Sequence, residues 1–203
     1  MSASQPSHLS PIITHATRRD IPEILSMIRL LAASSTNTFP ISATEASLSQ
    51  NLTFATTPTP TTFFTTTGSV TVPQEFYPSS SACVTKVMLL RHGEEGEVIG
   101  MAIYYPNFST WRCAAGIHLE DLIVKAEYRG RGFGEMLIRA LAGLVLEMDG
   151  GKGSGRLEWV CEKGNVRALR LYQALGAERM NGWVGLRVEG NDLVGMAEGG
   201  KTA

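Results

Sequence analysis

Residues 118–146, HLEDLIVKAEYRGRGFGEMLIRALAGLVL, decide the fold of this chain. Leu119, Asp121 and Ile123 alternate with Glu120, Leu122 and Val124, which is the period of a β-strand. A glycine-rich turn follows at residues 129–134. After it, apolar residues recur at helical spacing: Phe133, Leu137, Ala140, Leu141, Leu144 and Met148. The stretch therefore predicts a strand, a glycine turn and a helix, in that order.

The glycine turn has the composition of a pyrophosphate site. Glycines let the backbone approach a ligand closely, and the first N–H groups of the helix point outward at the positive end of its dipole. The dinucleotide-binding pattern G-x-G-x-x-G fails because residue 135 is Glu, and no Gly-Lys-Ser/Thr of a P-loop follows. On this stretch alone, an ordinary strand-to-helix turn stays an alternative. A nucleic-acid-binding RG segment is disfavoured, because the net charge is −1 and the motif occurs once.

Two motifs carry a resemblance to a known family. R-x-x-G-x-G occupies residues 129–134, and N-x-x-A-x-x-x-Y occupies residues 165–172. With these motifs the chain resembles the GNAT superfamily of acetyl-CoA-dependent N-acetyltransferases, closest to its diamine (spermidine/spermine) and thialysine branch. The phrases LEDLIVKAEYRGRGFG and RLYQALGA, the pair Gly182-Trp183 and the opening IITHATRRDIPEILSMIRLLA are similar to that branch. Residues 36–82 and about the last dozen lie outside the resemblance.

The resemblance implies an α+β fold: a mixed, mainly antiparallel sheet, splayed at its centre, with helices on both faces. The strands at 114–125 and 156–161 would part to admit the acetyl-CoA arm. The backbone of Leu122, Ile123 and Val124 would pair with the pantetheine, and the N–H of Leu122 could face the oxyanion. The pyrophosphate would contact Arg129, Gly130, Arg131, Gly132, Phe133, Gly134 and Glu135. Asn165 and Ala168 would line the other side of the cofactor.

Amide formation from a thioester needs a base for the ammonium and an acid for the leaving thiolate. By the resemblance, Glu120 is the candidate base, directly or through water, and Tyr172 the candidate acid. Asp121, expected on the other face of the strand, is the weaker candidate base. Glu120 could instead be a solvated carboxylate, and Tyr172 a helix anchor. The residues expected to contact the amine are Glu120, Asp121, Glu158, Trp159 and Trp183.

The acceptor is less well defined than the donor, because the chain lacks two acids of the polyamine-acetylating branch. Residues 34–39 contain no acid, and Asn181 precedes Gly182-Trp183. A small or amino-acid-like amine is therefore as well supported as a diamine or polyamine. Two other functions stay open: an acyl-CoA-binding regulatory or scaffold protein without turnover, and a protein N-acetyltransferase.

Composition indicates one globular domain: 203 residues, 43% hydrophobic and 18% charged. We expect a flexible segment at 1–10, the acetyltransferase domain at 11–189 and a polar tail at 190–203. The domain would include a Thr/Pro/Ser-rich insertion at 55–82, which is either a partly disordered loop or a lid. Strands are expected at 11–16, 84–91 and 97–105, helices from residue 21, at 44–54 and at 165–175, and a closing hairpin from 178–180 and 182–189.

Charge and cysteine usage limit the partners. With 18 basic and 19 acidic residues, we expect neither nucleic acid nor a membrane as a partner. Three cysteines without a C-x-x-C pattern argue against a disulfide framework and a metal site. We expect a cytoplasmic location, since no secretory signal is present. The resemblance implies a homodimer.

Overall fold

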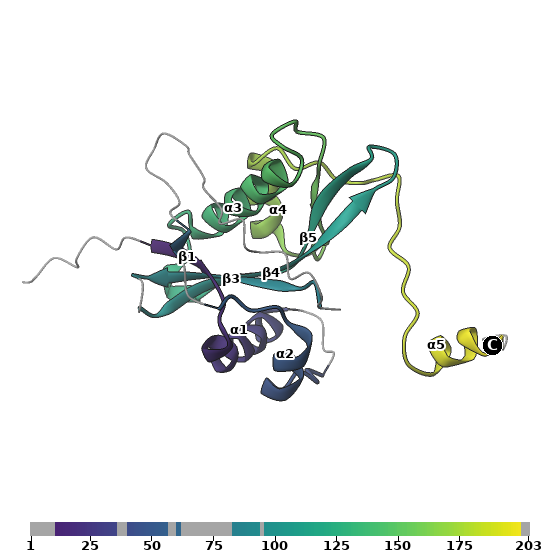
Figure 1. Cartoon of the computed structure of the whole chain (residues 1–203), viewed down its shortest axis with the longest axis horizontal. Coiled ribbons are helices and arrows are strands. Elements are labelled where there is room, and N and C mark those ends of the chain that lie inside the picture. Colours follow the sequence, from purple (N-terminus) through teal and green to yellow (C-terminus); the bar gives the residue numbers. More distant parts are fainter. Residues whose placement is uncertain (1–10, 36–39, 57–59, 62–82, 94–95, 200–203) are drawn as a thin grey trace, which may run out of the picture. The chain divides into compact units, whose positions relative to one another are not determined.

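A computed structural model describes residues 11–35, 40–56, 60–61, 83–93 and 96–199 (Figure 1). The chain divides into two compact units, residues 1–162 and residues 163–203. The first unit holds the sheet, and each unit is described by itself below.

The first unit is built on a six-stranded sheet with the strand order β2-β1-β3-β4-β5-β6. Its strands are β1 (Pro11–His15), β2 (Pro60–Thr61), β3 (Lys86–His92), β4 (Val98–Ser109), β5 (Ala114–Val124) and β6 (Leu157–Trp159). All neighbouring strands are antiparallel except β5 and β6, which are parallel. This confirms the predicted mixed, mainly antiparallel sheet.

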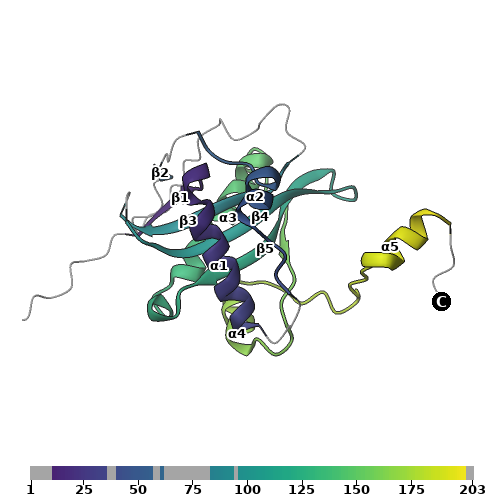
Figure 2. The same cartoon turned by 90° about the horizontal axis from the view of Figure 1, so that it is seen from below.

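Helices cover both faces of this sheet, as predicted. Helices α1 (Ile21–Ser34) and α2 (Glu45–Asn51) lie on one face, and α3 (Phe133–Met148) lies on the other (Figures 1 and 2). Apolar side chains of the strands alternate between two buried clusters. The cluster under α1 contains Ile24, Met27, Leu89, Met101, Ile103 and Ile123. The cluster under α3 contains Met88, Leu90, Ile99, Tyr104, Leu119, Leu137 and Leu141. We call the two sides of the sheet the α1 face and the α3 face.

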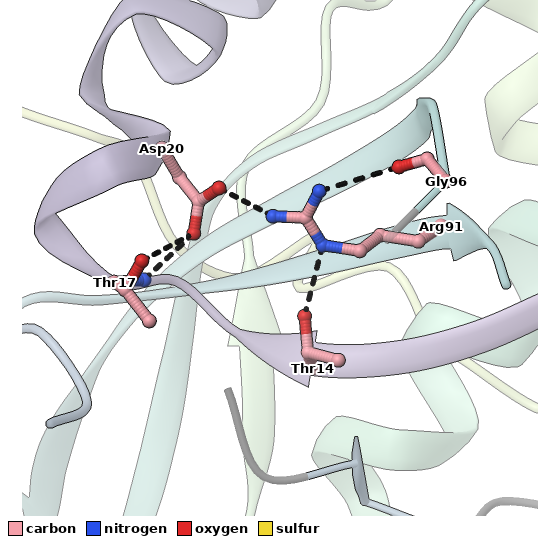
Figure 3. A network of polar contacts seen from close by, with 5 residues as sticks. All are labelled: Thr14, Thr17, Asp20, Arg91 and Gly96. Atoms are coloured by element: carbon pink, nitrogen blue, oxygen red, sulfur yellow. Dashed lines mark hydrogen bonds and ion pairs between the residues drawn. The ribbon is translucent and has the colours of Figure 1, made fainter. Parts of the chain in front are cut away.

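A polar network fixes the start of α1 against β3 (Figure 3). The Asp20 carboxylate accepts hydrogen bonds from the backbone N–H and the hydroxyl of Thr17, at 2.8 and 3.0 Å. Arg91 forms an ion pair with the same carboxylate. Its other nitrogens lie 3.4 Å from the Thr14 hydroxyl and 3.4 Å from the Gly96 carbonyl. Arg91 thus contacts Thr14 of β1, Gly96 in the turn before β4 and Asp20 just before α1. Because these contacts join the sheet to Asp20, the network sets where α1 begins on the sheet.

The Thr/Pro-rich insertion contributes an edge strand. Residues Pro60–Thr61 pair with Thr14 and Ile13 of β1 as the outermost strand. Proline is tolerated there because an edge strand need not donate every backbone N–H. The rest of the prediction for 62–82, loop or lid, lies outside the described residues. The predicted helix at 44–54 is shorter, Glu45–Asn51, and begins after Thr44, whose hydroxyl accepts the Ser47 N–H at 3.1 Å.

The second unit contains α4 (Val166–Ala174) and α5 (Gly190–Ala197), the latter within the expected polar tail. Asn165 caps α4, its side chain accepting the Ala168 N–H at 3.1 Å. The predicted closing hairpin is wrong, because residues 177–189 contain no strand. Val184 and Leu186 do alternate with polar residues and glycine, but they are 82% and 91% exposed. Alternation produces a strand only when a neighbour completes the hydrogen-bond ladder.

None of the helices in the described part of the chain is long and apolar enough to cross a membrane.

Candidate acetyl-transfer site

A β-bulge interrupts β5 at Glu120. Tyr104 of β4 pairs with Leu119, and the preceding residue, Ile103, pairs with Asp121, so Glu120 is the extra residue in β5. The bulge corrects the simple alternation expected from the sequence. Leu119 packs on the α3 face, whereas Asp121 is paired with a residue of the α1 face.

The same bulge gathers polar side chains on the α1 face. Tyr105 follows Tyr104, which is buried on the α3 face, and therefore points to the α1 face. Its ring stacks on His118, with centroids 5.0 Å apart and an interplanar angle of 21°. The Nε2 atom of His118 lies 3.8 Å from Oε2 of Glu120. Glu120 and Asp121 thus share one face although they are consecutive residues, so the expected separation of these two carboxylates across the strand is wrong.

A third carboxylate comes from β6. Glu158 pairs in register with His118. Its Oε2 lies 2.9 Å from Nε of Arg156, and its Oε1 accepts a hydrogen bond from the Asn107 amide at 2.5 Å. Glu158 is therefore fixed by two donors, whereas Glu120 has its side chain 56% exposed. Together we call Tyr105, His118, Glu120, Asp121 and Glu158 the acidic cluster.

The electrostatics of this cluster favour a cation. Burial and, to a smaller extent, the neighbouring Glu120 charge raise the pKa of Asp121 from 3.8 to about 6. Burial also raises the pKa of the Tyr105 phenol, with Glu120 and Glu158 contributing. Each shift records an environment that resists additional negative charge. A bound ammonium would relieve the repulsion between the carboxylates.

Strand β5 extends beyond its last pairing with β6. The parallel pairs run from Ile117–Leu157 to Leu119–Trp159, while β5 continues to Val124. The predicted parting of these two strands therefore begins beside the bulge. Beyond this point β5 is still paired with β4 on its other side, as far as Val124.

The direction of the backbone groups in this part of β5 follows from the ladder. The Lys125 N–H donates to the Ile99 carbonyl at 2.9 Å. Odd-numbered residues in this part of β5 therefore direct their backbone N–H and C=O groups toward β4. Leu122 and Val124 consequently direct their N–H and C=O groups to the opposite edge, and Ile123 does not. Of the three residues expected to pair with pantetheine, two have the required direction. The Val124 carbonyl accepts a hydrogen bond from Nε of Arg129 at 2.8 Å.

The glycine turn leads into α3 as predicted. Gly130 and Gly132 have φ of +82° and +80°, a left-handed conformation that glycine adopts without strain. A Cβ added at either position would meet no atom within 4 Å, so packing does not require glycine there. Gly132 is the N-cap of α3 and makes no side-chain cap, and Phe133, Gly134 and Glu135 form the first turn. This leaves the first N–H groups of a 16-residue helix without a side-chain cap, which suits a pyrophosphate.

The arginines of the turn are ordered by local contacts. Arg131 lies over the Tyr128 ring, 5.6 Å from its centroid, and donates to the Glu127 carbonyl at 3.3 Å. Arg129 is held by Val124, as described above. Both side chains therefore stay beside the turn, where their charge would complement a phosphate.

The remaining predicted residues lie elsewhere. Trp159 packs on the α3 face, so the structure does not bring it to the acidic cluster. Asn165, Ala168 and Tyr172 belong to α4 and its cap in the second unit, and Trp183 of that unit is 68% exposed. Among the described residues, no three His, Cys, Asp or Glu side chains are placed to share a metal ion.

Sequence reasoning missed two members of the cluster, Tyr105 and His118. Tyr105 follows a run of apolar residues in β4, and nothing in that run separates it from a core aromatic. His118 stands two residues before Glu120, which in an alternating strand places both on one face. That spacing was the available signal for His118. Tyr105 is identified only by its register with β5.

Comparison with known proteins identifies the family of this chain. The sequence model of the Acetyltransferase (GNAT) family matches residues 57–177. A thialysine N-epsilon-acetyltransferase of Bos taurus is 38% identical over 120 residues, covering 57% of this chain and 68% of that protein. An L-ornithine N5-acetyltransferase of Arabidopsis thaliana is 31% identical, and the matched region covers 47% of this chain and 40% of the plant protein.

A solved structure supports the fold. An integron cassette protein from the mobile metagenome of V. cholerae aligns with a TM-score of 0.64 at 21% identity. The alignment covers 94% of this chain and 99% of that protein.

Proposed function

Because this chain belongs to the GNAT acetyltransferase family, we propose that it transfers an acetyl group from acetyl-CoA to the side-chain amine of a small amino-acid-like acceptor. The observation that carries the choice of acceptor is the acidic cluster. Glu120, Asp121 and Glu158 converge on one face with the Tyr105 ring, and such a group suits one compact ammonium better than a long polyamine. The similarity to a thialysine enzyme and to an ornithine enzyme supports the same class of acceptor.

The donor side of the proposal uses the glycine turn and the outward edge of β5. Acetyl-CoA supplies an activated acyl group as a thioester. The uncapped N-terminus of α3 would bind its pyrophosphate, with Arg129 and Arg131 adding positive charge. Leu122 and Val124 would pair with the pantetheine arm, and the Leu122 N–H would donate to the acyl oxygen as negative charge develops there.

Proton transfer is assigned to two residues. An alkyl ammonium has a pKa near 10.4 and no lone pair, so a base must remove its proton before attack. We assign this to Glu120, directly or through water, because it is more exposed than Glu158 and, among the described residues, has no cation bound to it by a short contact. Asp121, with its pKa raised to about 6, is the second candidate and shares the face. Tyr172 is proposed to protonate the departing thiolate, on the strength of the N-x-x-A-x-x-x-Y pattern inside the family match.

An amine panel tests the proposed function. Thialysine, lysine, ornithine, spermidine and spermine would each be incubated with acetyl-CoA, and released CoA thiol would be followed. We expect kcat/KM to be higher for one of the three amino acids than for spermine, and to rise with pH as free amine forms. A clear preference for spermine or spermidine would contradict the proposed acceptor.

A single substitution, Glu120→Gln, tests whether Glu120 acts as the base. Glu120→Gln keeps size and polarity but cannot accept a proton, so its loss of activity should be largest near neutral pH and smaller at high pH, where free amine is abundant. Glu45→Gln, on α2, is the matched control, since Glu45 is an exposed residue outside the acidic cluster. Equal activity of Glu120→Gln and the wild type at every pH would remove Glu120 from the mechanism.

A further inference from the structure

His118 lies beside Glu120 in the acidic cluster and is the less exposed of the two side chains. Its side chain is 19% exposed, whereas the Glu120 side chain is 56% exposed. The imidazole is stacked on Tyr105 at 5.0 Å and 21°. Its Nε2 atom lies 3.8 Å from Oε2 of Glu120, so a hydrogen bond between the two atoms requires the exposed carboxylate to move closer. The stacked, less exposed ring can therefore determine where the more exposed carboxylate lies.

We propose that His118 is a positioning residue for Glu120 and makes amine acetylation sensitive to pH. With a neutral imidazole, Nε2–H donates to Glu120 and holds its carboxylate toward the acceptor amine. With a protonated imidazole, the two side chains form an ion pair that takes the place of the substrate ammonium. This inference rests on the proposed function and adds a residue to it.

The surroundings of His118 determine what its charge would meet. On its own strand are Glu120 and Asp121; β4 contributes the Tyr105 phenol, and β6 contributes Glu158 with its partner Arg156. Helix α1 on this face carries Glu23, which is 3.1 Å from Lys125, and the exposed Arg29. Three carboxylates of the cluster thus compete for the imidazolium and for the substrate. Glu158 is already held by Arg156 and Asn107, and Glu120 is the carboxylate whose Oε2 atom lies 3.8 Å from Nε2 of His118.

Two substitutions separate the donor from the ring. His118→Gln keeps an uncharged donor at all pH values, and His118→Phe keeps the stacking ring without a donor. At pH 8 we expect His118→Gln to retain kcat/KM within about threefold of wild type. His118→Phe should lose roughly tenfold, mainly in kcat, with an unchanged KM for acetyl-CoA. On lowering the pH to 6, the ratio of wild-type to His118→Gln activity should fall, because only wild type can form the ion pair.

Ionisation of the amine and of Asp121 affects wild type and His118→Gln alike, so its effect cancels in the ratio of their activities. His92→Gln, on β3, is the matched control and should give a constant ratio to wild type across the same pH range. A constant ratio for His118→Gln, together with wild-type kcat for His118→Phe, would overturn the inference.

A measurement that does not depend on turnover covers the case in which the His118 variants fold poorly. In ¹³C-labelled protein at pH 7, Glu120→Gln should displace the Cε1 resonance of His118 and leave that of His92 in place. An unmoved His118 resonance would also overturn the inference. If wild type acetylates no amine of the panel, the proposed function fails, whereas the NMR experiment still decides whether His118 and Glu120 interact.

Discussion

Glu120 and Asp121 are neighbours in the sequence, and both carboxylates lie on the α1 face of the sheet. The bulge at Glu120 is the cause, since Ile103 and Tyr104 of β4 pair with Asp121 and Leu119. The arrangement is costly, because burial and the Glu120 charge raise the pKa of Asp121 from 3.8 to about 6. A carboxylate kept at such a cost does not stabilise the fold, which fits the substrate-binding position proposed for it.

Asp121→Asn should therefore stabilise the protein at neutral pH. The folded state holds the Asp121 proton more tightly than the unfolded state, so this group lowers the free energy of unfolding as pH rises from about 4 to 6, and the loss persists above 6. Asparagine removes that cost, and we expect a gain of roughly 2 kcal/mol at pH 7.5 and little change at pH 4. Urea unfolding at both pH values measures it. A loss of stability at pH 7.5 would contradict the prediction.

His15 should make the fold sensitive to acid in the opposite sense. It lies 2.8 Å from the Tyr104 hydroxyl and is 3% exposed. Burial, with a contribution from Lys86, lowers the pKa of His15 from 6.5 to about 4. The unfolded state therefore binds its proton first, and stability is lost as pH falls from 6.5 to 4, by on the order of 3 kcal/mol.

His15→Gln tests this assignment, because glutamine offers a polar partner to Tyr104 and does not titrate. The difference in unfolding free energy between variant and wild type should shift in favour of the variant as pH falls from 6.5 to 4. His92→Gln serves as the control and should follow wild type. Parallel pH profiles for all three proteins would assign the acid sensitivity to other groups.

Gly132→Ala should weaken CoA binding beyond its effect on stability. The residue has φ of +80°, so alanine adds strain of about 1 kcal/mol even though its Cβ would meet no atom. Gly150→Ala is the matched control: φ is +67°, the space is equally open, and the position follows the C-terminus of α3. Calorimetry should show at least about a tenfold weaker Kd for CoA in Gly132→Ala alone. Equal affinity in the two variants would argue against the glycine turn as the pyrophosphate site.

Tyr172→Phe should reduce turnover by roughly 100-fold and leave CoA affinity unchanged, because the variant loses only the proton donor for the leaving thiolate. Steady-state kinetics at saturating substrates measures the effect, and the absence of a pre-steady-state burst of product confirms that chemistry limits the rate. Wild-type turnover under those conditions would remove Tyr172 from the mechanism.

The sequence alone determined the local elements of this protein. Turn chemistry and helical spacing are properties of a few adjacent residues, so the strand at 114–125, the left-handed glycines of the turn and α3 were all predictable from residues 118–146. The Asn165 cap and the start of α1 after Asp20 follow from equally short patterns. Each of these features depends on backbone conformations and hydrogen bonds made within a few residues.

Only the tertiary structure decided the acidic cluster and the absence of the closing hairpin. Both depend on register, which is set by pairing between strands distant in the sequence. One extra residue at Glu120 moves Asp121 to the α1 face, and no pattern within β5 contains that information. Tyr105 joins His118 because β4 and β5 pair at that level. In residues 182–189 the strand pattern is present, but among the described residues no neighbouring strand pairs with it, so alternation alone gives no ladder.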